Sequence, residues 1–107
     1  MKYLVWAGLG GGFGGPNFQG IFEFNNDTEA EEESRNMAIE EYQSYEGHHG
    51  INSFEDIIDN YEDFGITDVD NLDEVGEAYN EEVEFWIVYR YELYDGREID
   101  EEGNYIE

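Results

Sequence analysis

The clearest hydrophobic pattern in the chain lies near its C-terminus, between Glu82 and Tyr94. Every second residue of this stretch is apolar, and these residues form one continuous face: Val83, Phe85, Ile87, Tyr89, Tyr91 and Leu93. A period of two residues places alternate side chains on opposite faces of a strand. The stretch 82–94 therefore predicts a long antiparallel strand with one face on the core. Asp95-Gly96 then predicts a turn into a short hairpin arm.

Two more strands are predicted near the N-terminus. Residues 2–7 are rich in β-forming side chains, and residues 20–25 alternate phenylalanine with glutamate, which favours a half-buried strand. Seven of the thirteen residues in 8–20 are glycine, so this part of the chain is predicted to be a loop.

A long helix is predicted after the second strand. Asn26 to Thr28 offers helix caps, and Thr28 with Glu31 has the spacing of a capping box. Apolar residues at helical spacing continue to Tyr45, and Gly47 provides a stop.

Shorter helices are predicted from Ser53 to Gly65 and over residues 73–79. The resulting order of elements predicts an α+β fold. We expect an antiparallel sheet of three to four strands, with two or three helices packed on one face. A chain of this length forms one domain, so residues 1–107 are expected to be a single acidic α+β domain.

Charge changes this picture more than any other property. The chain has 29 acidic and four basic residues, a net charge of −25, and no acid among residues 1–22. Because 17% of the residues are aromatic, we expect a folded domain with an acidic surface and not a disordered acidic tail. Self-repulsion at this charge costs stability, and −25 exceeds what solubility needs.

The same charge excludes two classes of ligand. Phosphate binding needs lysine and arginine, so direct nucleic-acid binding is not expected. Anionic lipid repels such a surface, and the apolar run at residues 3–9 is too short to span a bilayer. The chain has no cysteine, which is compatible with the cytoplasm, where we expect the protein to act.

The glycine-rich loop contains a match to a nucleotide-binding motif. Gly10 to Gly15 fits G-x-G-x-x-G, but Pro16 and a strand follow it instead of a helix. The favoured interpretation is a plain connection between strands. A second interpretation is an interaction loop that docks through Phe13 and Phe18.

Candidate catalytic and metal-binding patterns are weak. His48 and His49 are adjacent and point in different directions, and residues 68–72 begin like a calcium loop but place Leu72 where a ligand belongs. No pattern resembles a nucleophile elbow or a catalytic triad. We therefore predict no catalytic residue, no metal site and no cofactor, and a protein that is not an enzyme.

The acidic residues predict a partner with a groove lined by lysine and arginine, in which carboxylates take the places of phosphates. Aromatic residues among them, Tyr61, Tyr79 and Tyr94, could stand in for bases or pack on arginine. The candidate contact residues form two groups. They are Glu29, Glu32, Glu33, Glu40 and Glu41 in the first helix, and Glu55, Asp56, Asp59, Glu62, Asp63, Asp68, Asp70, Asp73 and Glu74 in the middle of the chain.

Residues 23–107 resemble, in size, acidity and lack of cysteine, the anti-defence proteins of phages and mobile elements. This class includes DNA-mimic anti-restriction proteins and several anti-CRISPR inhibitors. Residues 20–24 (Gly-Ile-Phe-Glu-Phe) and 42–46 (Tyr-Gln-Ser-Tyr-Glu) are also similar to the amino-terminal part of the ArdA-type anti-restriction proteins. The resemblance implies a non-enzymatic inhibitor in the host cell that occupies the nucleic-acid-binding surface of a nuclease, restriction or CRISPR effector.

Two alternative functions stay open at this point, one of which is a small enzyme or cation-binding module. The chain could be a structural or accessory phage protein that binds its partner through the loop with Phe13 and Phe18, or through the face that carries Trp86. A homodimer could also form, because the strand at 82–94 could pair across an edge of the sheet.

Overall fold

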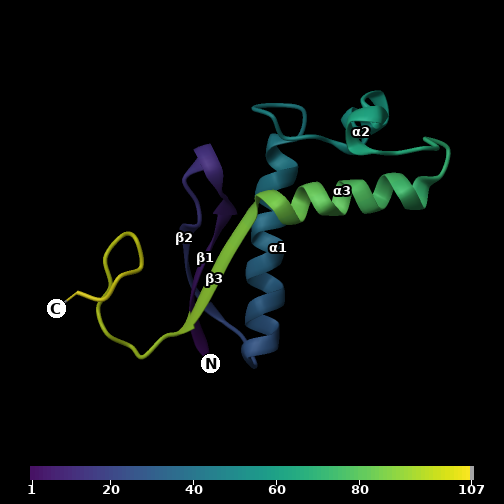
Figure 1. The fold of residues 1–107 in the computed structure, drawn as a ribbon. Coiled ribbons are helices and arrows are strands. Elements are labelled where there is room, and N and C mark those ends of the chain that lie inside the picture. The colour runs from purple at the N-terminus through teal and green to yellow at the C-terminus, as the bar shows by residue number, and fades with distance from the viewer. Residues whose placement is uncertain (107) are drawn as a thin grey trace.

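A computed structural model describes residues 1–106 (Figure 1). Three strands form one antiparallel sheet in the order β2-β1-β3, so the predicted α+β class with an antiparallel sheet is confirmed. The main elements are β1 (Lys2–Leu9), β2 (Asn17–Glu23), α1 (Asp27–Tyr45), α2 (Phe54–Asp59), α3 (Leu72–Trp86) and β3 (Ile87–Leu93), with short 3₁₀ turns at Gly11–Phe13 and Tyr61–Phe64.

The central strand β1 is covered on both of its faces, since every residue from Tyr3 to Leu9 is buried. Alternate residues of a strand point to opposite faces. Ala7 and Leu9 lie on the face that packs against α1, where they cluster with Tyr42 (Figure 1). Trp6 lies on the other face, which the C-terminal segment covers.

Helix α1 confirms the predicted long helix, but it begins at Asp27, so Thr28 lies inside it and the predicted capping box of Thr28 and Glu31 does not form. Its N-cap is Asn26, whose side chain accepts a hydrogen bond from the Glu29 backbone N–H at 2.9 Å. The buried positions recur every fourth residue, from Ala30 through Ser34 and Ala38 to Tyr42. The small side chains of Ala30, Ser34 and Ala38 let this part of the helix approach the sheet closely.

Helices α2 and α3 pack mainly against each other, and α3 reaches the core on the sheet at Val83, near its C-terminal end. They enclose a small separate core of Ile57, Ile66 and Val75. Figure 1 shows α3 projecting away from the sheet, with α2 above it. We call this part, residues 54–86, the α2–α3 lobe. Of the helices predicted to cover one face of the sheet, α1 alone does so extensively.

The predicted strand at 82–94 is wrong over its first five residues, which belong to α3. The third helix, predicted over 73–79, runs on to Trp86, and β3 begins at Ile87. The physical reason is a helical stripe that includes Val75, Tyr79 and Val83, preceded by the Asn71 cap. The stripe and the cap favour a helix that continues to Trp86. Residues 82–86 therefore form helix hydrogen bonds instead of the strand pairing that their alternation predicts.

The connection between β1 and β2 is shorter than the glycine content predicts. Strand β2 covers 17–23 and not 20–25, so the loop is a tight turn in which the Gly15 backbone N–H donates to the Leu9 carbonyl at 2.8 Å. A Cβ at Gly15 would lie 2.6 Å from that carbonyl oxygen, whereas a Cβ at Gly12 would meet nothing within 4 Å.

Gly15→Ala is therefore expected to lower the free energy of unfolding by about 1–3 kcal/mol, because the clash is with backbone that cannot rotate away. Gly12→Ala is the matched control and should change it by less than about 0.5 kcal/mol. Urea unfolding of both variants measures the difference. Equal stability of the two variants would contradict the described path of the loop.

Tyr79 connects α3 to the end of α1, because its hydroxyl donates a hydrogen bond to a carboxylate oxygen of Glu46. Burial, together with this hydrogen bond and the charge of Glu46, raises the pKa of Tyr79 from 10.0 to about 12. The native state thus keeps the proton over a pH range in which the unfolded chain loses it.

The sign of the resulting pH dependence follows from this difference in proton binding. The contribution of Tyr79 to stability is complete below pH 10 and is lost as the pH rises to about 12. In Tyr79→Phe, the fall in the free energy of unfolding over this range should be smaller than in the native chain. Urea unfolding at several alkaline pH values provides the measurement, and identical falls in both proteins would contradict it.

Candidate functional site

The five candidate glutamates of α1 differ in their surroundings. Glu32, Glu33 and Glu40 are exposed, whereas Glu29 and Glu41 are half-buried. The three exposed residues lie opposite the buried side of the helix and extend over about 12 Å, at 1.5 Å per residue. We call them the α1 stripe. They can meet a partner without rearrangement of the helix.

The mid-chain acids differ in exposure and in their hydrogen bonds. Asp56 and Ser53 form a capping box at the start of α2, with Asp56 accepting from the Ser53 N–H at 2.9 Å. Glu74 accepts from the Thr67 N–H at 2.6 Å. Seven candidates are exposed: Glu55, Asp59, Glu62, Asp63, Asp68, Asp70 and Asp73. All seven belong to the α2–α3 lobe, whereas the α1 stripe belongs to the first helix.

The segment that begins like a calcium loop is a helix-capping turn. The Asp68 carboxylate accepts from the Asp70 N–H at 3.0 Å, and the Asn71 side chain accepts from the backbone N–H groups of Asp73 and Glu74. Among residues 1–106, no three His, Asp or Glu side chains lie where they could hold one metal ion. The oxygens of this turn therefore serve the start of α3.

Few of the carboxylates have a cationic partner. Within the described part of the chain, the ion pairs join the Met1 amino group to Glu23, Arg35 to Glu84 and Arg97 to Asp95. The Arg97 backbone N–H and guanidinium group hold the pKa of Asp95 below its usual range. The α1 stripe has no such partner, so its charge is directed to solvent.

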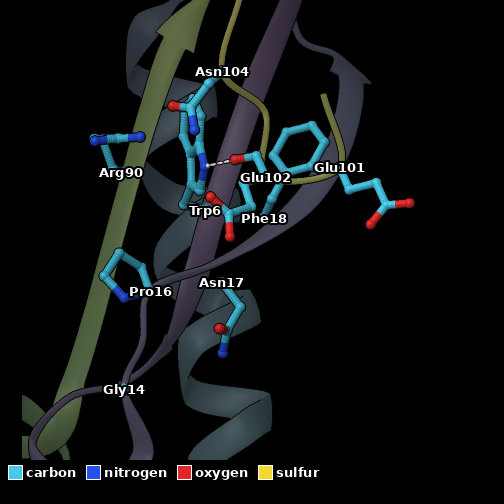
Figure 2. Close-up of a pocket in the computed structure, with 9 residues that line it drawn as sticks. All are labelled: Trp6, Gly14, Pro16, Asn17, Phe18, Arg90, Glu101, Glu102 and Asn104. Carbon is cyan, nitrogen blue, oxygen red and sulfur yellow. Dashed lines mark hydrogen bonds between the residues drawn. The ribbon is translucent and has the colours of Figure 1, made fainter. Parts of the chain in front are cut away.

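A cavity of about 560 Å³ lies on the sheet face opposite α1 (Figure 2). Trp6 is one of its lining residues. The Arg90 guanidinium carbon lies 3.9 Å from the centroid of the Trp6 ring, and the centroids of the Phe18 and Trp6 rings are 5.5 Å apart. The Trp6 indole N–H donates to the Glu102 carbonyl at 2.8 Å. The cavity thus combines aromatic walls with the polar side chains of Arg90, Glu102 and Asn104.

The C-terminal segment forms the outer wall of this cavity and only partly resembles the predicted hairpin arm. Up to residue 106, its one isolated β-bridge joins Ile99 to Tyr105. A Cβ at Gly103 would lie 2.6 Å from the Phe18 ring, so the segment fits closely against the sheet. Phe18 is therefore an internal contact and is not free to dock into a partner.

The glycine motif does not open a helix, because strand β2 follows it. Phe13, at its centre, packs against Tyr45 and Trp86, with ring centroids at 5.0 and 5.8 Å. His49 completes this group at 6.5 Å from Phe13. The motif therefore lacks the helix N-terminus that holds pyrophosphate, and its phenylalanine is part of an aromatic cluster.

Sequence reasoning misses one surface residue of interest. Phe85 is predicted to lie in the core, but its residue is 78% exposed near the end of α3. A signal was available, because Tyr79, Val83 and Trp86 also fit one helical stripe, and a helix with that stripe turns Phe85 outward.

Comparisons with protein-family models, characterised proteins and solved structures found no match. No helix within residues 1–106 has the length and apolarity needed to cross a membrane. Function is therefore inferred from the surface chemistry of the chain itself.

Proposed function

We propose that this protein is a non-enzymatic inhibitor that binds the basic nucleic-acid-binding surface of a host defence protein in the cytoplasm. The target is a nuclease, restriction or CRISPR effector. Exposed carboxylates occupy the positions that phosphates take in the natural complex. The observation that carries the proposal is the α1 stripe, three exposed glutamates on a rigid helix with no cation paired to them.

Electrostatics favour such a complex in two ways. A charge of −25 steers the chain toward a basic surface and raises the rate of association. A partner's lysines and arginines also relieve self-repulsion among the carboxylates, which the chain's own four basic residues cannot do.

The alternative function as a structural or accessory protein draws less support from the geometry. It needs free aromatic side chains on the glycine-rich loop, and both Phe13 and Phe18 are packed against other rings of the chain. Trp86 is half-buried in the same cluster as Phe13.

The proposed function is tested by affinity capture from host lysate at about 50 mM and about 500 mM salt, because screening weakens contacts between exposed charges. We expect a basic nuclease, restriction or CRISPR component to be recovered at the lower concentration and lost at the higher. The purified component should then lose nucleic-acid binding when this chain is added. Recovery that is independent of salt would overturn the proposal.

A further inference from the structure

Phe85 is the most exposed large apolar residue of the described chain. A single exposed apolar side chain is common on protein surfaces and means little by itself. Phe85, however, adjoins a larger aromatic group. Its ring lies 5.5 Å from Trp86 at an interplanar angle of 86°, and Trp86 in turn contacts Phe13.

The position of Phe85 is fixed by its backbone. It lies in the last turn of α3, and the next residues are the half-buried Trp86 and the buried Ile87. Because the backbone is already held, only the rotations of the ring itself are lost when it enters a partner's pocket, which favours binding.

Carboxylates flank Phe85 on the same side of α3. Glu77 and Glu81 lie eight and four residues before it and are exposed, whereas Glu84, next to it in sequence, points to a different side of the helix, toward Arg35 of α1. Residues four apart on a helix have Cβ atoms about 5–6 Å from each other. Glu84 is paired with Arg35, whereas Glu77 and Glu81 have no ion pair within residues 1–106. An aromatic ring therefore projects beside a row of negative charges.

We propose that Phe85 acts as the counterpart of an unstacked base, and that the partner's groove is built for single-stranded nucleic acid. The inference rests on the proposed function and specifies its partner. Proteins that bind single strands combine a basic groove with aromatic side chains on which bases stack. A duplex keeps its bases stacked inside and presents mainly phosphates and base edges, so a groove built for a duplex offers a phenyl ring less aromatic surface than one built for a single strand.

The tyrosines considered as base substitutes are less available than Phe85. Tyr79 is half-buried and donates a hydrogen bond to Glu46. Tyr94 is half-buried, and its ring stacks on Tyr105. Tyr61 is only 38% exposed.

The test uses two defined probes, a short lysine-rich peptide with interspersed tryptophans and the same peptide with alanine at those positions. The lysines represent the basic groove and the tryptophans its stacking platform. By calorimetry, the native chain should bind the tryptophan peptide about two- to tenfold more tightly. This ratio should persist at higher salt, whereas affinity for both peptides should fall.

Three variants assign the preference to one residue. Phe85→Ala should bring the ratio close to one, and Phe85→Tyr, which keeps a ring, should retain it. Leu72→Ala, at the other end of α3 and 64% exposed, is the matched control and should also retain it. Thermal unfolding confirms that each variant is folded.

The outcomes separate this inference from the proposed function. A native ratio of one, or a ratio unchanged in Phe85→Ala, would overturn the role of Phe85 while leaving charge mimicry intact. Weak binding of both peptides without salt dependence would reject charge mimicry itself. A dimer in sedimentation that disappears in Phe85→Ala would assign the ring to self-association and would also overturn the inference.

Discussion

Replacing the α1 stripe with lysine (Glu32→Lys, Glu33→Lys and Glu40→Lys together) should weaken binding to the basic partner about a hundredfold at low salt. Two unit charges 4 Å apart interact by about 1 kcal/mol in water, so losing each attraction costs about that much, before the repulsion of the new lysine is added. Three reversals therefore cost about 3 kcal/mol or more, which corresponds to about a hundredfold in affinity. The fold should survive, because all three residues are exposed. Titration against the captured partner provides the measurement.

The matched control reverses three exposed acids elsewhere, Glu92, Glu98 and Glu101. Each triple variant gains six units of charge, which takes the net charge from −25 to −19 in both. If both variants lose affinity equally, total charge and not the α1 stripe determines binding. If neither loses affinity, charge mimicry is wrong.

Tyr42→Ala should be the most damaging core substitution, lowering the free energy of unfolding by about 3–5 kcal/mol. Tyr42 is fully buried where α1, the sheet and the α2–α3 lobe meet, and its ring packs edge-on against Tyr79 at 5.9 Å. Its hydroxyl donates to the Asn52 carbonyl at 2.6 Å. The whole free energy of unfolding of a natural domain is about 5–15 kcal/mol, so this substitution removes a large part of it.

A milder substitution at the same site separates packing from hydrogen bonding. Tyr42→Phe keeps the ring but leaves the Asn52 carbonyl without its donor, for a cost of about 1–3 kcal/mol. Tyr61→Ala, at an exposed position, should cost less than about 0.5 kcal/mol. Urea unfolding of the three variants gives the order, and a loss below that of Tyr61→Ala for either Tyr42 variant would contradict the described core.

The elements predicted correctly from sequence are those whose local signals agree. Helix α1 has a cap at Asn26, acids in its first turn and an apolar stripe, and all three indicate the same helix. Strand β1 contains the run of β-forming residues from Tyr3 to Trp6, although it continues past the predicted end at Ala7 through Gly8 to Leu9. These features depend on neighbours in sequence, so they need no knowledge of the tertiary structure.

The boundary between α3 and β3 could not be placed in this way. Tyr79, Val83 and Ile87 are four residues apart, and residues four apart share a face in a helix as well as in a strand. The alternation from 82 to 86 was therefore compatible with both. The choice fixes whether Phe85 points to the core or to solvent, so the error in the strand concealed the exposed ring.

The sequence shows how many acidic residues the chain has, but it says little about which of them have a structural role. The spacing of Ser53 and Asp56 is that of a capping box, so the structural role of Asp56 could have been predicted. The role of Glu74 could not, because it depends on how the loop at Thr67 folds back over seven residues. Arg90 stacks on Trp6 from the opposite end of the chain, so no pattern among neighbouring residues predicts this contact.

Helix α3 passes into β3 without an intervening loop, since Trp86 ends one element and Ile87 starts the other. The Arg35–Glu84 pair ties the same end of the helix to α1. The direct junction between α3 and β3 thus sets the angle at which the lobe leaves the sheet. Under the proposed function, a target that contacts both α1 and α3 must match this angle, so it is selected by its shape as well as by its charge.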